Sequence, residues 1–423
     1  MTSGVPTKRR VLPDELLLRL AREFGTPLYV YDAATIAARA KQLLELRASS
    51  GRGFDAVRYA QKANPNLAIL RVLREAGCAV DAVSGGELRR ALAAGWKSDE
   101  VLFCADLFDR DTLALLASTP FQLNAGSPFM LEQYARANPP RRDVVLRVNP
   151  GFGHGHDRKV STGGEHSKHG IWHEDLADTI AHARSLGLAV TGLHVHIGSG
   201  SDLENLARSS AALVAASELC RDTLRTLSAG GGLPIPYRPT EAHFDPTPLL
   251  ETWDRARAQV ERRLGRTIRL ELEPGRFLVA EAGLLLAEVR GSKRSGSVEY
   301  VFVDAGFHNL VRPAMYGAYH EISVVGRDAD ERVPLAVAGP LCESADVFTQ
   351  SKGGVLEPRL LPRPRVGEVV CFHDAGAYGA SMASGYNSQL PACEVLVHNG
   401  SAKLARPRPS HEEALQTELE LLE

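Results

Sequence analysis

The sequence lacks the features of a membrane protein, a disulfide-linked protein or a nucleic-acid-binding protein. Its six cysteines are scattered over 423 residues without a C-x-x-C pair, which argues against a zinc knuckle or a disulfide scaffold. The longest run without charge, 112–131, contains prolines and amides and does not predict a membrane span. Lysine plus arginine (49) nearly balance aspartate plus glutamate (51), so no net positive field favours nucleic acid or an anionic membrane. Since no apolar stretch of signal-peptide length opens the chain, we expect a cytoplasmic globular protein with no membrane or nucleic-acid partner.

Apolar runs of strand character alternate with segments of helical period between about residues 55 and 285. The strand candidates are 57–61, 79–83, 101–105, 121–124, 144–149, 190–196, 226–230 and 268–273. Eight such units are the number that closes a parallel (β/α)8 barrel of the TIM type. An open doubly wound sheet is the alternative, but no G-x-G-x-x-G follows the first strand.

The composition pattern changes after about residue 285. Strand-like runs are separated there by glycine, proline and charge, and no clear helix is expected before 411–423. This predicts an all-β domain, a sandwich or barrel with antiparallel connections. The first 35 residues, including the run 27–32, can supply a strand to either domain. We therefore expect an α/β protein with a barrel at 36–284 and a β domain formed by 1–35 plus 285–423.

Two of the predicted barrel strands end in residues that suggest a cofactor, and barrel chemistry lies at these strand ends. Lys62 follows the first strand; it is either an ordinary surface lysine or a buried amine with a lowered pKa that forms a Schiff base. His194 and His196 end the sixth strand, where a flat ring can stack on an aromatic cofactor and Ser199 can contact phosphate. No carboxylate or further histidine accompanies them at the spacing of metal ligands, so no metal is expected.

The last two predicted strands end in glycines and in a pair of carboxylates. Gly230–Gly232 is typical of a tight turn, but after the seventh strand of a barrel bare N–H groups often bind phosphate. Glu271 and Glu273 share a strand face and need a cationic partner, which a protonated pyridine nitrogen would supply. Amine, flat ring, phosphate cradle and carboxylate together predict a pyridoxal phosphate site.

Several motifs give the chain a family resemblance from about residue 15 to 420. They are YAQKANPN (59–66), VDAVSGGEL (80–88), RVNPGFGHGH (147–156), TGGEHSKHGI (162–171), HVHIGSG (194–200), GGGLPIPY (230–237), ELEPGRFLVAEAG (271–283), RPAMYGAYH (312–320), GPLCESADVF (339–348) and DAGAYGASMASGYNS (374–388). In order and spacing the chain resembles the diaminopimelate decarboxylase family, which belongs to the fold-type III, alanine-racemase-like pyridoxal phosphate enzymes. The resemblance implies decarboxylation of meso-2,6-diaminopimelate to L-lysine and carbon dioxide, the last step of lysine biosynthesis by the diaminopimelate pathway.

The resemblance also implies a role for each matching residue. Lys62 would form the Schiff base, His196 would stack on the ring, and Glu273 would pair with the ring nitrogen. Cys342 would donate the proton, reaching the site from the partner subunit of a homodimer with shared active sites. The implied cofactor-binding residues are Lys62, His196, Ser199, Gly231, Gly232, Glu273, Gly275, Arg276 and Tyr378. The implied substrate-binding residues are Arg276, Arg312, Tyr316, Glu343 and Tyr378.

Two other functions compete with this one. A sister decarboxylase would act on ornithine, arginine or another basic amino acid; such relatives tend to have aspartate at the position of Glu343 and to lack Arg312. An inactive homologue that serves as a regulatory binding protein would be expected to have lost Lys62 or Cys342, and both are present. Decarboxylation of diaminopimelate is therefore the favoured function.

A few positions depart from the family pattern or carry a local prediction. His308, Ala345 and Gln389 stand where relatives often have other residues, and we expect them to alter affinity rather than the reaction. Arg312 precedes Pro313, and a residue before proline disfavours the helical region. We therefore expect an extended backbone at Arg312.

Overall fold

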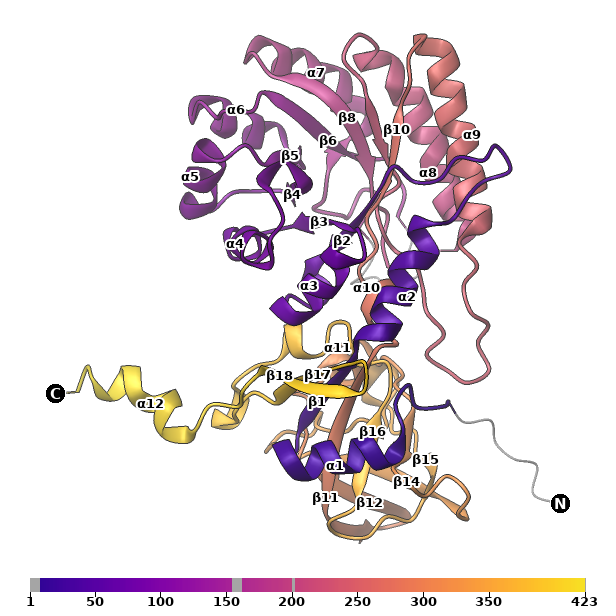
Figure 1. Cartoon of the computed structure of the whole chain (residues 1–423), viewed down its shortest axis with the longest axis vertical. Coiled ribbons are helices and arrows are strands. Elements are labelled where there is room, and N and C mark those ends of the chain that lie inside the picture. Colours follow the sequence, from indigo (N-terminus) through magenta and orange to yellow (C-terminus); the bar gives the residue numbers. More distant parts are fainter. Residues whose placement is uncertain (1–7, 154–161, 200–201, 423) are drawn as a thin grey trace. The chain divides into compact units, whose positions relative to one another are not determined.

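The computed structural model describes residues 8–153, 162–199 and 202–422, and these form two compact units (Figure 1). The barrel unit comprises Ala37–Pro234 and Phe244–Leu278, and the β-rich unit comprises Met1–Ile36, Ile235–His243 and Val279–Glu423. Residues 235–243 and 279–284, which the sequence-based division included in the barrel, group with the β-rich unit. One reason is local packing, since Tyr237 contacts His320 edge-to-face at 5.4 Å between ring centroids.

A closed ring of parallel strands forms the centre of the barrel unit. Its strands are β2 (Ala56–Ala60), β3 (Ala79–Ala82), β4 (Val101–Ala105), β5 (Gln122–Ala125), β6 (Asp143–Asn149), β8 (Ala189–Val195), β9 (Thr226–Ser228) and β10 (Arg269–Leu272). Within the described residues the ring has eight strands, and it closes because β10 pairs with β2 and β5 pairs with β6. A short strand, β7 (Ile171–Trp172), extends β6. The predicted (β/α)8 barrel is confirmed, with its strands at the predicted places.

Helices follow most of the barrel strands, as the periodic segments predict (Figure 1). They are α3 (Leu67–Glu75), α4 (Gly85–Ala94), α5 (Arg110–Ser118), α6 (Pro128–Arg136), α7 (Leu176–Ser185), α8 (Leu203–Ala216), α9 (Thr247–Leu264) and α10 (Arg276–Val279). The helix α2 (Ala33–Leu44) instead precedes the first barrel strand. Side-chain caps fix where several begin: Ser84, Asp109 and Asp202 each accept a hydrogen bond from a backbone N–H in the first turn. Sequence and local structure agree closely here.

The β-rich unit contains a branched mixed sheet. Its strands are β1 (Leu28–Asp32), β11 (Gly283–Ser295), β12 (Val298–Val303), β13 (Ile322–Val324), β14 (Arg332–Ala338), β15 (Arg359–Pro362), β16 (Val369–Phe372), β17 (Cys393–His398) and β18 (Ser401–Arg406). The N-terminal strand β1 joins this unit, antiparallel to β11 and parallel to β17. The mostly-β second domain is confirmed. The expectation of purely antiparallel connections is wrong, because β12 and β14 also pair in parallel.

Strand alternation explains how β1 is held. Leu28 and Val30 lie opposite Leu286 and Leu284 of β11 and are fully buried in one apolar cluster with them. The helix α1 (Asp14–Phe24) adds Leu20 and its neighbours to the same cluster. Because side chains alternate along a strand, Tyr29 faces the other way, and its hydroxyl donates to the Asn309 carbonyl at 2.6 Å.

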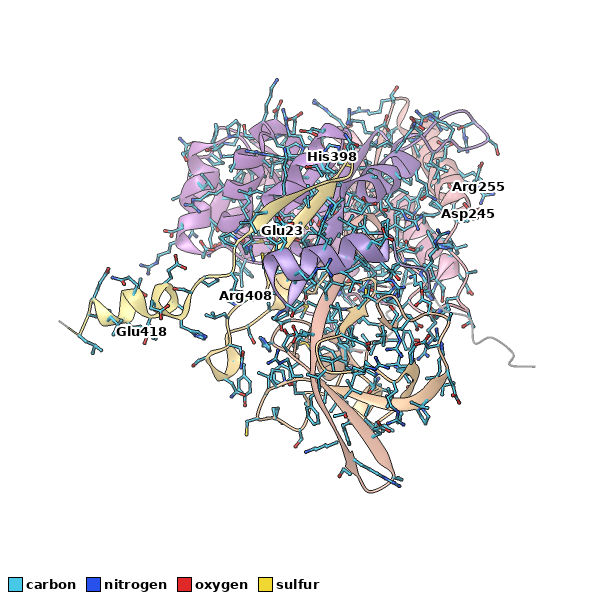
Figure 2. All side chains as sticks on the ribbon, turned by 60° about the horizontal axis from the view of Figure 1, so that its bottom comes forward. Glu23, Asp245, Arg255, His398, Arg408 and Glu418 are labelled. Atoms are coloured by element: carbon cyan, nitrogen blue, oxygen red, sulfur yellow. The ribbon has the colours of Figure 1, made fainter. Side chains whose placement is uncertain are left out.

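One helix of the β-rich unit contradicts the sequence-based prediction and another agrees with it. Arg312 begins a short helix, α11 (Arg312–Tyr316), so the predicted extended backbone and the predicted absence of a helix before 411 are both wrong. Pro313 is tolerated because the first turn of a helix needs no N–H from its proline. The predicted C-terminal helix is present as α12 (His411–Leu419), which carries the labelled Glu418 in Figure 2 and has no buried side chain. Among the helices in the described ranges, none has the length and apolar character needed to cross a bilayer.

Candidate active site

Lys62 lies immediately beyond the C-terminal end of β2, in the 3-10 turn Gln61–Ala63. The turn is anchored on both sides: Gln61 donates its amide N–H to the Glu87 carbonyl at 3.0 Å, and the Tyr59 hydroxyl donates to the Asn64 carbonyl at 2.9 Å. The Lys62 side chain itself is exposed, which corrects the expectation of a buried amine. A lysine on an anchored turn at the mouth of a barrel is available to a ligand.

A carboxylate is held ionised inside the barrel just after β10. Glu273 is only 6% exposed; the Ser228 hydroxyl donates to its Oε1 at 2.7 Å, and His194 Nε2 lies 2.9 Å from its Oε2. Burial opposes ionisation, but His194 and Ser228 outweigh it and bring the pKa of Glu273 to about 2. The other predicted carboxylate, Glu271, is instead used in a bidentate pair with Arg58, at 2.7 and 3.1 Å. Glu273 is therefore the carboxylate available to a cationic ligand group.

The charge of Lys62 acts on two groups in the centre of the barrel, Asp81 and His196. Burial raises the pKa of Asp81 well above its usual range and nearby Glu273 raises it further, while the Lys62 ammonium acts in the opposite direction. Burial lowers the pKa of His196 far below its usual value, and Lys62 lowers it further. Lys62, Glu273 and His196 are thus close enough to influence one another. At neutral pH His196 is a neutral, flat imidazole.

The three glycines after β9 form the wall between His196 and Glu273. The Gly230 N–H donates to Ser228 Oγ and the Gly231 N–H donates to His196 Nδ1, each at 3.2 Å. For the Gly232 N–H, no acceptor is found in the parts of the chain that the structure describes. Side chains are excluded here, because a Cβ on Gly231 would lie 2.3 Å from the Glu273 carbonyl oxygen. A bare N–H in such a turn is a suitable donor to an anion.

The remaining predicted cofactor residues of the barrel unit lie along the same rim. A Cβ on Gly275 would meet the Ala60 carbonyl and the Ala63 side chain at 3.2 Å, so Gly275 lies directly against the Lys62 turn. Arg276 begins α10 and is buried. Ser199 follows Gly198, whose carbonyl oxygen would be 2.3 Å from a Cβ on Gly232. Residues 154–156 of the RVNPGFGHGH motif and residue 200 of the HVHIGSG motif lie outside the described residues.

One cluster in this centre has the geometry of a metal site. Single ligand atoms of Cys104, His194 and Glu273 lie within 4.8 Å of one another. Burial raises the pKa of Cys104 well above its usual value, so the sulfur is a thiol at neutral pH, and Asn124 donates an N–H to it at 3.1 Å. Because metals bind the thiolate, this chemistry does not favour a metal at the cluster.

In the β-rich unit, Arg312 and Tyr316 stand at the two ends of α11. Arg312 is only 3% exposed; its Nη1 lies 2.7 Å from His320 Nε2, and its guanidinium lies over the Tyr237 ring at 4.8 Å from the centroid. Tyr378 lies on the loop after β16 with φ of 58°, in the left-handed region.

Cys342 and Glu343 are exposed on the loop after β14, and hydrogen bonds to the backbone fix the base of this loop. The buried Asp346 carboxylate accepts the N–H groups of Leu341, at 2.8 Å, and of Phe307, at 2.7 Å. Asn387, with φ of 54°, accepts the Cys342 N–H at 2.9 Å. The loop is therefore fixed at its base while the cysteine and glutamate side chains remain accessible.

Sequence reasoning missed the residues that support these groups. Ser228 and Asp81 lie at inward positions of barrel strands, and Asp346 follows the cysteine loop. A polar side chain inside a predicted barrel strand was the available signal for the first two. Of the departures from the family pattern, His308 is buried, which lowers its pKa to about 4, and the Ala345 carbonyl accepts from Gln350 at 2.8 Å.

Comparison with known proteins agrees with this geometry. Residues 34–280 match the family described as "Pyridoxal-dependent decarboxylase, pyridoxal binding domain". The chain is 50% identical over 412 residues to the diaminopimelate decarboxylase of Streptomyces coelicolor, covering 96% of this chain and 92% of that protein. A crystal structure of diaminopimelate decarboxylase superposes with a TM-score of 0.91 at 47% identity, covering 97% and 98% of the two chains. Another from M. jannaschii, in complex with L-lysine, has a TM-score of 0.85 at 30% identity, covering 95% and 94%.

The barrel, its strand-end residues and the matching domain identify the chain as a pyridoxal phosphate-dependent decarboxylase. The relatives that match over nearly the whole length are more specific. The chain belongs to the diaminopimelate decarboxylase family.

The residues present fit the cofactor that this family uses. Pyridoxal phosphate carries an aldehyde, a pyridine nitrogen and a phosphate. The barrel offers an amine at Lys62, an ionised buried carboxylate at Glu273 and a bare N–H at Gly232. His196, which is neutral, adds a flat ring that can stack on the pyridine ring.

The Gly232→Ala substitution tests whether the glycine turn 230–232 binds the phosphate of the cofactor. Gly232 has φ of 98°, and an added Cβ would lie 2.3 Å from the Gly198 carbonyl oxygen. Strain of about 1–3 kcal/mol is expected in such a backbone, so affinity for pyridoxal phosphate should fall by roughly tenfold or more. Titration of the cofactor-free protein with pyridoxal phosphate, followed by absorbance, would measure this affinity.

Gly265→Ala is the matched control. Gly265 also has a positive φ, 66°, but a Cβ there would meet nothing within 4 Å, at the end of α9. We expect cofactor affinity close to that of the parent. Equal affinities for the Gly232→Ala protein and the parent would show that the cofactor's phosphate does not use this turn.

Proposed function

We propose that the chain decarboxylates meso-2,6-diaminopimelate to L-lysine and carbon dioxide, with pyridoxal phosphate as cofactor. The similarity to diaminopimelate decarboxylases over 96% of the chain carries this assignment. The bound L-lysine in the M. jannaschii structure is consistent with lysine as the product. A decarboxylase of ornithine or arginine is not favoured, because the relatives that match over nearly the whole chain at 47–50% identity are diaminopimelate decarboxylases.

The barrel, which the sequence predicted at 36–284, is the proposed cofactor-binding domain. Lys62 would hold the cofactor covalently through its amine, and Glu273 would hold a proton on the ring nitrogen by charge pairing. His196 would lie flat against the ring. Ser199, Gly231, Gly232, Gly275, Arg276 and Tyr378 are the proposed phosphate and near-phosphate contacts. When bound, pyridoxal phosphate supplies a conjugated ring that accepts the electron pair left at Cα as carbon dioxide departs.

The far end of the substrate carries a second carboxylate and a second amine, and the β-rich unit has a partner for each. We infer that Arg312 binds the distal carboxylate through its guanidinium fork and Glu343 binds the distal ammonium. Arg276, Tyr316 and Tyr378 complete the proposed substrate contacts. Cys342 would return a proton to Cα of the product as a general acid.

A homodimer with shared active sites would explain the placement of Cys342 and Glu343. Both side chains are exposed in the single chain, on a loop fixed by Asp346 and Asn387. Rigid presentation of exposed acid groups suits residues that complete the site of a second copy. We further propose that the protein acts in the cytoplasm.

Carbon dioxide release tests the assignment directly. Purified holoenzyme should act on meso-diaminopimelate and far less on L-lysine, ornithine or arginine. Lys62→Ala should lose this activity and the visible absorbance of the bound cofactor, and borohydride should fix the cofactor of the parent on Lys62.

Lys41→Ala is the control for the loss of a lysine in general, since Lys41 is exposed and forms an ion pair with Glu45 at 3.7 Å. It should keep both activity and absorbance. Full turnover in Lys62→Ala would remove Lys62 from the mechanism, and preferential turnover of ornithine or arginine would contradict the proposed substrate.

Arg312→Ala tests substrate selection. A buried hydrogen-bonding site rejects an analogue that lacks the recognised group by on the order of 10⁴-fold. The variant should raise KM for diaminopimelate and narrow its advantage over lysine in kcat/KM by tenfold or more. Arg290→Ala, which removes a mostly exposed arginine of the same unit, should change neither value. Unchanged discrimination in Arg312→Ala would show that another residue selects the substrate.

Complementation tests the shared site. Lys62→Ala and Cys342→Ala should each be inactive alone, whereas mixed and exchanged subunits should recover about a quarter of the parent activity, because half of the dimers would hold one intact site. Native mass spectrometry would verify that subunits exchange. Absence of activity in proven hybrid dimers would mean that each site is built from one chain.

A further inference from the structure

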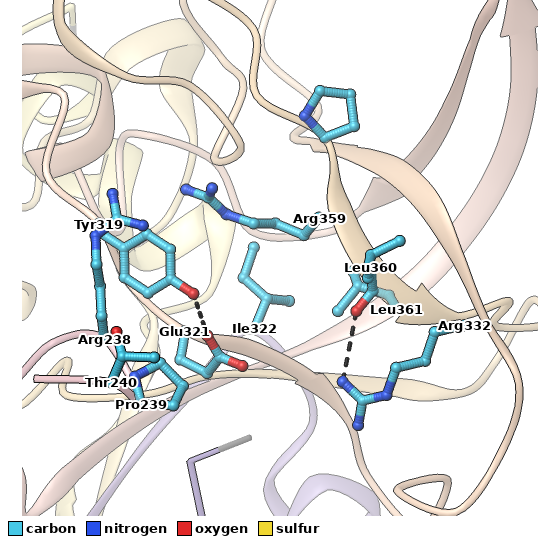
Figure 3. Close-up of a pocket in the computed structure, with 11 residues that line it drawn as sticks. Arg238, Pro239, Thr240, Tyr319, Glu321, Ile322, Arg332, Arg359, Leu360 and Leu361 are labelled. Atoms are coloured by element: carbon cyan, nitrogen blue, oxygen red, sulfur yellow. Dashed lines mark hydrogen bonds between the residues drawn. The ribbon is translucent and has the colours of Figure 1, made fainter. Parts of the chain in front are cut away.

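A cavity of about 250 Å³ lies within the β-rich unit, and none of the residues that line it belongs to the proposed active site (Figure 3). It is bounded by residues 238–240, by the chain entering β13, and by β14 and β15. Three arginines and a single carboxylate line it: Arg238, Arg332, Arg359 and Glu321. Its charge balance therefore favours an anion.

Two of the arginines are positioned by one aromatic ring. The guanidinium carbons of Arg238 and Arg359 lie 4.1 and 4.3 Å from the centre of the Tyr319 ring. The Tyr319 hydroxyl in turn donates to the Glu321 carboxylate (Figure 3). Stacking on an aromatic face holds a guanidinium without using its N–H groups, which stay available as donors.

These arginines are short of acceptors. In the described chain Arg238 has no side-chain hydrogen bond or ion pair, and Arg359 Nε is buried without an acceptor. Arg359 reaches Glu357 only through Nη1, at 3.4 Å. Arg332 makes long contacts with two carbonyl oxygens, at 3.4 and 3.5 Å, and pairs with no carboxylate in the parts of the chain described. Arg238 is exposed, so water can accept from its N–H groups, but the buried Arg359 Nε has no such acceptor, and a buried donor of this kind is costly unless a ligand supplies one.

Glu321 does not neutralise the three arginines. Glu321 is buried, and its carboxylate accepts the hydrogen bond from the Tyr319 hydroxyl. Within the described residues it forms no ion pair with an arginine. Burial raises the pKa of Glu321 above its usual value. The rest of the wall includes Ile322, an apolar surface that suits a short hydrocarbon body.

We propose that this cavity binds a small oxyanion, a carboxylate or phosphate on a short apolar body, through Arg238, Arg332 and Arg359. A cation such as lysine is disfavoured there by the excess of positive charge. The proposal stands on the β-rich unit alone and does not depend on the proposed reaction.

Titration calorimetry of the pyridoxal phosphate-loaded enzyme with inorganic phosphate and with butyrate tests the proposal. Saturable binding of phosphate alone would indicate a phosphate head group, and binding of butyrate alone a carboxylate; both would support the site. Arg238→Gln and Arg359→Gln should each weaken binding about tenfold, the size expected for a charge-assisted hydrogen bond.

Two further variants make the result specific. Glu321→Gln keeps an acceptor for the Tyr319 hydroxyl but removes the negative charge, so binding should become several-fold tighter, which a misfolded protein would not show. Arg363→Gln removes an exposed arginine beside β15 that pairs with Glu299, and should bind like the parent. The proposal fails if neither anion binds saturably, if Arg238→Gln and Arg359→Gln bind like the parent, or if Glu321→Gln does not bind more tightly.

Discussion

The barrel centre depends on keeping one carboxylate ionised where burial would protonate it. Glu273 meets this constraint because strand register brings its two partners to it: His194 of β8 lies opposite Ser228 of β9, and Ser228 lies opposite Glu271, two residues before Glu273 on β10. With its pKa at about 2, Glu273 is anionic throughout the neutral range. A cofactor whose ring must stay protonated needs this fixed charge, and His196 and the glycine turn are arranged around it.

The two units contribute different kinds of residue to the proposed chemistry. The barrel holds its groups in a buried, interlocked centre, where even a methyl on Gly231 would collide with backbone. The β-rich unit instead exposes Cys342 and Glu343 and fixes only the base of their loop, through Asp346 and Asn387. Groups that bind a resident cofactor gain from rigid burial, whereas groups proposed to complete the site of a second chain must remain accessible.

Much of the fold could be predicted from the sequence because barrel strands are continuous apolar runs that recur with intervening helices. The long strand β11 was not predicted, since its second half is charged and exposed. Arg312 was misjudged because the rule for residues before proline ignores helix starts. Site residues at strand ends could be found from position and resemblance. Their supports, Ser228 and Asp346, could not, because a hydrogen bond between distant residues depends on register and loop packing that local sequence does not contain.

Arginines in this chain fall into two groups that differ in what satisfies them. Arg58 is buried and forms a bidentate pair with Glu271, so its charge is fully used within the fold. Arg238 and Arg359 are oriented by stacking on Tyr319, and their N–H groups lack a comparable carboxylate. Stacking orients a guanidinium without using its N–H groups, whereas the bidentate pair with Glu271 uses those of Arg58. The N–H groups that stacking leaves available on Arg238 and Arg359 are the donors that the proposed oxyanion would use.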